Sequence, residues 1–147
     1  MSHTTKLLAV PVKDISSLYQ AAAELSQSGV NCSIKQNIKP RMYFENQVGA
    51  CPYILSLPDC RYDVGFELQP DGSYLPLIDM WGNHVQNSIG AACRVDKAED
   101  APLRAIGRFM QSYSKNAAIN AAVAAGYMVD SCVIDSEGNV QLEISVN

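Results

Sequence analysis

Hydrophobic positions near the start of the chain pass from a strand pattern to a helical one. The apolar run at 7–12 predicts a strand, and Asp14 shortly after it is a residue type that favours helix N-caps. Apolar residues then recur at helical spacing as far as Gly29, which can adopt the left-handed conformation that ends a helix. These residues are Ile15, Leu18, Ala22 and Leu25. The pattern predicts a strand followed by an amphipathic helix.

Strand patterns in the middle of the chain are less regular. Residues 30–44 combine apolar with basic positions, but Pro40 has no N–H for a sheet ladder and therefore shortens any central strand. A second short apolar run at 53–57 lies between two prolines. The pattern is compatible with one strand or with two across 30–57.

A β-hairpin is the clearest element in the sequence. Apolar and polar residues alternate over 62–68, and the chain returns as a second strand at 74–81. The Pro-Asp-Gly turn at 70–72 joins them, because proline presets φ and glycine accepts a positive φ. If the loop closes with Gln69 opposite Ser73, the register of the two strands is fixed.

This register places Asp63 opposite Asp79 on one face of the hairpin. Two like charges facing each other cost a few tenths to about 1 kcal/mol, so we expect a compensating cation. We expect Arg61, one step along the same face, to bridge both carboxylates and to stack on Trp81. The face is then either a network that fixes the register or a contact patch for a ligand or partner, with His84 from the next loop beside it.

The second half of the chain predicts a long helix and a second hairpin. Residues 82–100 show no steady period and are long for a connection, which is typical of functional loops. A helical stripe runs from 102 to 125, with an alanine-rich C-terminal half, and Gly126 ends it. Alternating strands follow at 128–134 and 140–146. Because alanine is small, the last half of this helix can approach a sheet or a second copy of the chain closely.

The composition fits one folded domain. The chain has 147 residues, of which 48% are hydrophobic and 18% charged, enough for a full core without metal ions or disulfides. Together with the elements above, this predicts a single α+β domain over 1–147. We expect an antiparallel sheet of about five to seven strands with two helices packed on one face.

Cysteine usage and hydropathy favour a reducing compartment. The five cysteines are odd in number and contain no C-x-x-C pair, as is typical of reduced, buried thiols. The first apolar run is too short for a signal peptide, and no run approaches the ~18 apolar residues of a membrane helix. We therefore expect a cytoplasmic protein that does not enter the membrane.

Charge weighs against nucleic acid as a partner. The net charge is -4, whereas nucleic-acid-binding domains carry a basic stripe that neutralises phosphates. The exception is a basic stretch at Lys35, Lys39 and Arg41, next to Tyr43 and Phe44. It is typical of an edge strand whose lysines deter pairing, and the alternative is a small stacking patch for single-stranded nucleic acid or a nucleotide.

Residue types that carry catalysis are scarce. There are two histidines, and no cysteine lies in a sequence context that marks it as an activated nucleophile for His84. Only Cys93 and Asp96 accompany His84 as nearby metal-ligand types, so we expect no metal site. No glycine spacing matches a phosphate-binding loop, and we expect no cofactor. An enzyme is the less favoured class, with Asp63 and Asp79 as the remaining candidates for carboxylate catalysis.

Short motifs in one order cover most of the chain. They are the Met1-Ser2-His3 start, Lys13-Asp14, the 62–66 stretch, the 74–79 strand with Trp81, Gln111 and Tyr113, Gly126-Tyr127 and the Glu137-Gly138-Asn139 turn. In this order and spacing the chain resembles the conserved hypothetical chloroplast reading frame thirty-five family, a domain of unknown function found in plastids, cyanobacteria, other bacteria and bacteriophages. The resemblance implies no specific activity, and the phage members make a phage or bacterial host-interaction role an expectation.

Two classes of function follow. The first is a non-enzymatic binding or adaptor protein that contacts a protein or small ligand and forms a homodimer through a sheet edge or the alanine-rich helix half. The alternative is a small nucleotide- or ligand-binding protein or enzyme, in which Arg61, Asp63 and Asp79 form a patch beneath the 82–100 loop. Side chains converging on a cavity there would favour the second class.

Overall fold

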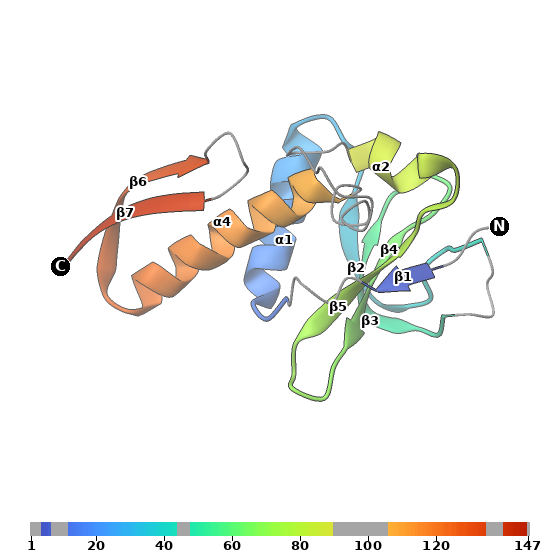
Figure 1. Ribbon diagram of the computed structural model, residues 1–147, viewed down its shortest axis with the longest axis horizontal. Coiled ribbons are helices and arrows are strands. Elements are labelled where there is room, and N and C mark those ends of the chain that lie inside the picture. The colour runs from blue at the N-terminus through green and yellow to red at the C-terminus, as the bar shows by residue number, and fades with distance from the viewer. Residues whose placement is uncertain (1–3, 7–11, 44–47, 90–105, 135–139, 147) are drawn as a thin grey trace.

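A five-stranded antiparallel sheet forms the body of the protein (Figure 1). The computed structural model describes all residues except 1–3, 7–11, 44–47, 90–105, 135–139 and 147. Across the sheet the strands follow the order β1, β5, β4, β3, β2. They are β1 (Thr4–Lys6), β2 (Ser33–Ile38), β3 (Cys51–Ser56), β4 (Val64–Leu68) and β5 (Tyr74–Asp79). Because β2 and β3 pair as separate antiparallel strands, the 30–57 stretch contains two strands.

The hairpin of β4 and β5 has the predicted register. Leu68 pairs with Tyr74, and Phe66 pairs with Pro76. The loop closes where Gln69 donates its backbone N–H to the carbonyl oxygen of Ser73 at 2.8 Å. The alternation of side chains and the Pro-Asp-Gly turn were therefore sufficient to define this hairpin.

The helix α1 (Ile15–Gln27) begins at its predicted cap and ends before its predicted stop. Asp14 accepts the backbone N–H of Ser16 at 3.1 Å, and the hydroxyls of Ser16 and Ser17 also donate to its carboxylate. The hydrogen bonds from Ser17 and Ser16 lower the pKa of Asp14 from its usual value to about 2. Gly29 adopts a φ of 107° directly after the last turn, in the left-handed region that favours glycine.

Two predicted elements reach outside the described residues. Of the strand predicted at 7–12, only Val12 is described, and it forms an isolated antiparallel bridge to Tyr74. The predicted start of the long helix at 102 is likewise not among the described residues. The helix itself is α4 (Gly107–Ala124), and it ends within a residue of the predicted position.

Short helices occupy the start of the stretch predicted to be irregular. The 3-10 turn η2 (Trp81–Asn83) is followed by α2 (His84–Ile89). Gly82, in the middle of η2, has a φ of 62° and kinks the chain there. Neither element is long enough to show a helical period in the sequence. The remainder of the predicted loop falls outside the described part of the chain.

The main core lies between the sheet, α1 and the first turns of α4. Leu18 of α1, Phe66 of β4 and Phe109 of α4 are fully buried, and the two phenyl rings are 6.0 Å apart. The buried residues of α4 all precede position 117: they are Phe109, Met110, Tyr113 and Asn116. The alanine-rich remainder of α4 therefore lies outside this core.

The connection between β2 and β3 covers the opposite face of the sheet. On β3, Leu55 joins the main core whereas its neighbour Ile54 points to the other face, as the two-residue period of a strand requires. That face carries a second buried cluster of Met42, Cys51, Ile54 and Leu77. Both faces of the sheet are thus covered.

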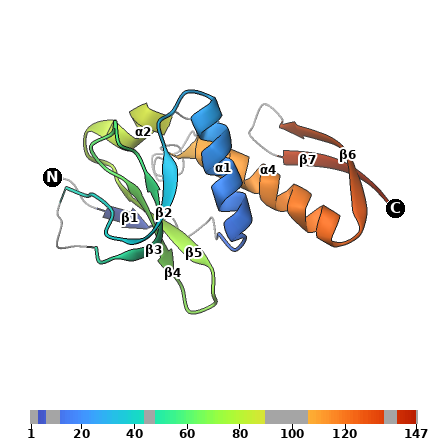
Figure 2. The ribbon, with the colours of Figure 1, turned by 180° about the vertical axis from the view of Figure 1, so that it is seen from behind.

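The last two strands form a sheet of their own. β6 (Tyr127–Ile134) and β7 (Val140–Val146) pair with each other and, among the described strands, with no others. The α+β class and the antiparallel pairing are confirmed, but the strands divide over two sheets. The second half of α4 carries this hairpin away from the body of the protein (Figures 1 and 2). We call residues 117–134 and 140–146 the C-terminal arm.

Of the two helices expected on one face of the five-stranded sheet, only α1 and the first turns of α4 share the core there. α1 and α4 pack mainly against each other, and the later part of α4 packs against the β6–β7 hairpin. The physical reason lies in the side chains, because α4 has no large buried apolar residue after Met110 other than Tyr113. Without such residues its second half has nothing with which to dock on the five-stranded sheet.

Candidate functional site

The buried carboxylate of Asp63 binds Arg41. Asp63 is 3% exposed. Its Oδ2 accepts the backbone N–H of Arg41 at 2.9 Å and the Nε–H at 3.0 Å, while Oδ1 accepts Nη2–H at 2.9 Å. The backbone N–H of Leu57 also donates to Oδ1, at 3.1 Å. Burial alone would raise the pKa of Asp63, but these hydrogen bonds outweigh it and lower the pKa.

Asp79 holds the same connecting segment from the neighbouring strand. It is 1% exposed and accepts the backbone N–H of Tyr43 at 2.9 Å. The backbone N–H of Asp63 donates to the carbonyl oxygen of Arg41 at 3.0 Å. The two carboxylates therefore bind alternate residues of one segment and fix it over the sheet. Asp63 and Asp79 therefore have a structural role. The hydrogen bonds that they accept from this segment offset the repulsion expected between opposed carboxylates.

The predicted bridge by Arg61 is wrong. Arg61 is exposed, and within the described residues it forms no ion pair. Arg41 supplies the cation for Asp63 from a position 22 residues earlier in the chain. The predicted stacking on Trp81 concerns a side chain outside the described part of the structure. A partner contact through the exposed Arg61 stays a prediction.

Pairing of Arg41 also changes the predicted basic patch. Its guanidinium donates to Asp63 and, through Nη2, to the carbonyl oxygen of Leu57 at 2.7 Å, so its charge is balanced within the protein. Lys35 on the edge strand β2 and Lys39 just after it are exposed. Two exposed lysines at a sheet edge fit the edge-strand interpretation better than a phosphate-binding surface.

His84 packs against the ring of Tyr62. The ring centroids are 5.5 Å apart and the ring planes meet at 82°. Tyr62 is 3% exposed, and its hydroxyl finds no hydrogen-bond partner in the described structure. Burial, together with the nearby charge of Asp79, raises the pKa of this phenol. No described hydrogen bond joins His84 to a carboxylate or thiol, so the geometry lacks the pairing that nucleophilic catalysis uses.

Two of the described cysteines are poor nucleophiles. Cys32 and Cys51 are buried, and burial raises the pKa of both thiols, which keeps them protonated at neutral pH. Cys60 is buried as well, and Cys132 is half-buried on the arm. No group of three His, Cys, Asp or Glu side chains within the described ranges is placed to hold a metal ion.

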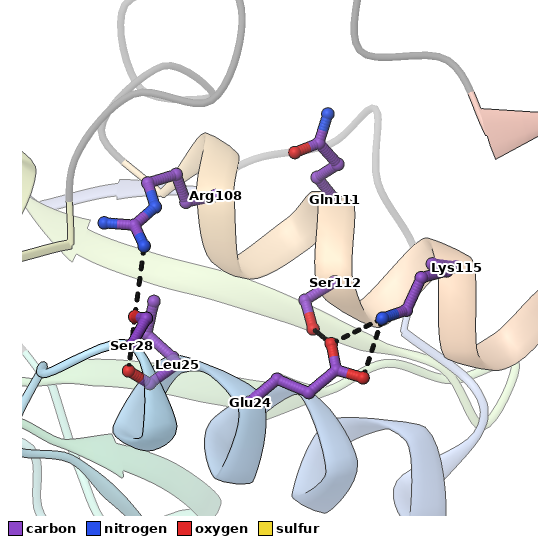
Figure 3. A pocket seen from close by; sticks show the side chains of 7 residues that line it. All are labelled: Glu24, Leu25, Ser28, Arg108, Gln111, Ser112 and Lys115. Atoms are coloured by element: carbon purple, nitrogen blue, oxygen red, sulfur yellow. Dashed lines mark hydrogen bonds and ion pairs between the residues drawn. The ribbon is translucent and has the colours of Figure 1, made fainter. Parts of the chain in front are cut away.

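A polar groove of about 210 Å³ runs between α1 and α4 (Figure 3). At one end Glu24 accepts two hydrogen bonds from Nζ of Lys115, at 2.7 and 2.8 Å, one from Asn116 at 3.2 Å and one from the hydroxyl of Ser112. Partial burial would raise the pKa of Glu24, but these donors outweigh it and lower the pKa. The lining residues are Glu24, Leu25, Ser28, Arg108, Gln111, Ser112 and Lys115.

Arg108 occupies the other end of this α1–α4 groove. Its Nη1–H donates to the carbonyl oxygen of Ile89 at 3.0 Å, and its Nη2–H donates to Oγ of Ser28 at 3.0 Å. Both acceptors are neutral, and no described carboxylate lies within ion-pair distance of Arg108. The groove therefore offers a guanidinium that is held in position and that pairs with no carboxylate in the described part of the chain.

Exposed apolar side chains mark the C-terminal arm. Val146 is 81% exposed and Val123 is 59% exposed, and no arm residue of described burial is fully buried. The exposed large apolar residues of the arm are Val123, Tyr127, Met128, Val133, Ile144 and Val146. The alternation in β7 predicted one buried face, yet its apolar residues are at most half-buried. By the register of β6 with β7, Tyr127, Ile144 and Val146 share one face of the hairpin, whereas Met128 and Val133 lie on the other, so exposed apolar side chains occur on both faces of the arm.

Charge is also unevenly placed on the arm. From Asn116 to Val129 the sequence contains no charged residue. The described arm carries only acidic charges beyond that point, Asp130 in the β-bulge of β6 and Glu143 on β7. The second half of α4 and the first residues of β6 therefore form a surface without charged side chains.

Comparison with protein-family models, with curated proteins and with solved structures found no match to this chain. The resemblance noted from the sequence motifs therefore stays a prediction. Within the described residues, no helix has both the length and the apolar character needed to cross a bilayer.

Sequence reasoning missed two features of these surfaces. Arg108 showed only helical spacing, and its placement at a groove depends on the contact of α4 with α1. The alanine-rich half of the long helix was identified as a close-approach surface, but the exposed face of the following hairpin was not. The alternation of apolar and polar residues in β7 indicates that one face of the hairpin is apolar. It does not indicate what covers that face.

Proposed function

We propose that this protein is a non-enzymatic binding domain that works as a homodimeric adaptor, joined through its C-terminal arm. The observation that carries the proposal is the β6–β7 hairpin, whose apolar side chains stay exposed at the end of a projecting helix. The hairpin packs against the later part of α4, yet Ile144 and Val146 stay exposed, so a partner that removes them from water stabilises the arm. Phage or bacterial host interaction remains the broader role expected from the sequence resemblance.

A second copy of the chain is the occupant that the arm favours. In a twofold dimer each residue near the axis meets its own copy, so any charge there would repel itself. The stretch from Asn116 to Val129 has no charge and meets that condition. Its alanines also allow two helices to approach closely. The arm projects away from the five-stranded body, so two arms can meet without the bodies colliding (Figures 1 and 2).

The non-enzymatic class is supported by the chemistry of the described side chains. Asp63 and Asp79 are buried and engaged with the connection between β2 and β3, which leaves them unsuited to act as general acid and base. His84 packs on an aromatic ring. The alternative, a ligand-binding or catalytic patch of these residues beneath the 82–100 loop, has no converging side chains in the described part of the chain to support it.

Light scattering coupled to size-exclusion chromatography tests the dimer. The wild-type chain is expected to elute with twice its monomer mass, and an Ile144→Lys/Val146→Lys variant as a monomer, because two added charges per copy oppose each other at the interface. Leu68→Lys is the matched control, since Leu68 is also an exposed apolar strand residue, 53% exposed, but lies on the body. It should remain dimeric.

Two results would contradict the proposal. One is a wild-type chain that stays monomeric at all concentrations, and the other is a charged arm variant that stays dimeric. Far-ultraviolet circular dichroism of both lysine variants separates a lost interface from a lost fold. A monomeric arm variant with a wild-type spectrum assigns the interface to the arm.

A further inference from the structure

The α1–α4 groove contains an arginine that is positioned for binding and that forms no ion pair with a described residue. Arg108 has five N–H donors, of which two are used by the carbonyl oxygen of Ile89 and the hydroxyl of Ser28. The other three have no acceptor among the residues that the structure describes. An exposed arginine normally loses side-chain freedom when it binds an anion, but here the neutral acceptors already restrict it. The side chain is therefore prepared for an anion that the described chain does not supply.

The charges along the groove define what kind of anion fits. Arg108 and Lys115 contribute two positive charges, and Glu24 contributes one negative charge that pairs with Lys115. The net charge of these described lining residues is therefore that of one cation, located at Arg108. A monoanion is matched by this arrangement, whereas a phosphate dianion would exceed the positive charge and be repelled by Glu24. A planar carboxylate also fits two parallel N–H donors of a guanidinium.

Shape and the remaining side chains indicate where the rest of the ligand would lie. Residues 108, 111, 112 and 115 fall on one face of α4, because positions three, four and seven apart are neighbours on a helix. Leu25 supplies an apolar wall, and the side chain of Gln111 points outward from α4 at the rim, away from Glu24 and Leu25 (Figure 3). The volume of about 210 Å³ corresponds to roughly seven water molecules, which suits a small organic acid.

We propose that the α1–α4 groove is a binding site for a small monocarboxylate. Its carboxylate accepts two of the free N–H groups of Arg108, and its apolar part lies against Leu25. Gln111 offers an amide to a polar substituent at the rim. This site is independent of the dimer interface, because the lining residues all precede the C-terminal arm.

Titration followed by amide chemical shifts tests the site, with butyrate and benzoate as probes and inorganic phosphate as the competing class. Saturable shifts are expected at the amides of Ser28, Arg108 and Gln111 with the carboxylates. Arg108→Gln should weaken binding by about tenfold or more, the usual effect of removing a charge-assisted contact. Gln111→Glu should weaken it too, by placing a negative charge at the rim while leaving Arg108 and its hydrogen bonds in place.

Arg61→Gln is the control, because it removes one exposed arginine elsewhere and should leave the dissociation constant unchanged. Three results would each overturn the proposal. They are a linear, non-saturable response to the carboxylates, equal binding by Arg108→Gln and the wild-type chain, and tighter binding of phosphate than of the carboxylates. Since Gln111 makes no described hydrogen bond, the Gln111→Glu variant keeps the test decisive even if Arg108→Gln alters the contact of α4 with α1.

Discussion

The hydroxyl of Tyr113 on α4 accepts the backbone N–H of Asp14, the residue that caps α1, at 3.1 Å. It also accepts the backbone N–H of Lys13 at 2.9 Å. One side chain of α4 thus binds the entry of α1 and fixes where the two helices cross. Tyr113 is the last large apolar residue of α4 to be buried, so this contact also marks the point beyond which α4 leaves the core.

Replacing Tyr113 by Phe should lower the free energy of unfolding by about 1–2 kcal/mol, because two backbone donors lose their acceptor while the ring packing is kept. Urea denaturation of the monomeric Ile144→Lys/Val146→Lys background measures this directly. Tyr127→Phe removes a phenol hydroxyl from the exposed arm and should change the unfolding free energy by less than about 0.5 kcal/mol. Equal effects of the two substitutions would refute the anchoring role of Tyr113.

Acid should weaken the cap of α1. The pKa of Asp14 is lowered to about 2 by the hydroxyls of Ser17 and Ser16, so its ionised form is favoured in the folded state. A carboxyl with a depressed folded pKa contributes stability above its unfolded pKa, near 4, and that contribution disappears as the pH falls through the folded value. The stability difference between wild-type and Asp14→Ala should therefore be constant above about pH 5 and shrink towards pH 2. A difference that stays constant over this interval would show that the carboxylate charge does not contribute.

Because Asp63 pairs with Arg41 and not with Arg61, substitutions at Asp63 and at Arg61 should have different effects on stability. Asp63→Asn should destabilise the fold by about 3 kcal/mol, because it removes charge-assisted hydrogen bonds and leaves the guanidinium of Arg41 without its partner. That value is at the low end for buried pairs, since the Arg41 side chain is 48% exposed. Arg61→Gln should be neutral within about 0.5 kcal/mol. Thermal or chemical unfolding that ranks Arg61→Gln with Asp63→Asn would restore the bridge predicted from the sequence.

Close packing over the second face of the sheet requires glycine at position 65. A Cβ there would come within 2.9 Å of Sγ of Cys51 and 3.1 Å of Cγ of Pro40. Gly65→Ala should therefore cost about 1–3 kcal/mol, as overpacking in a core does. Combining it with Cys51→Ala should recover part of that loss. Additive effects in the double variant would mean that the two sites do not compete for space.

Local signals account for the part of the fold that the sequence predicted. The cap at Asp14, the stop at Gly29 and the register of β4 with β5 each depend on a few neighbouring residues, and each was correct. The pairing of Asp63 with Arg41 was missed because the connection between β2 and β3 folds back over the sheet. Nothing in the spacing of Arg61 and Arg41 distinguishes the two as partners.

The division of the strands into two sheets illustrates a different limit. Alternation in β7 correctly identified an amphipathic strand, but amphipathicity does not say which surface covers the apolar face. The decisive fact was the absence of large buried residues on α4 after Tyr113, which leaves the hairpin attached to the body by a helix of small side chains. The placement of Arg108 could not be predicted from the sequence either, because its groove exists only where α1 and α4 meet.

Self-association through the arm should make thermal stability depend on protein concentration. Partners that bind only the folded state stabilise it by mass action, and a hundredfold increase in concentration contributes about 2.7 kcal/mol per dimer. For a chain of this length, half of that value per copy corresponds to a rise in Tm of roughly 3–5 °C. The Ile144→Lys/Val146→Lys variant should show no such dependence, while Leu68→Lys should follow the wild-type chain. Calorimetry at matched concentrations provides the measurement, and a wild-type Tm independent of concentration would count against the dimer.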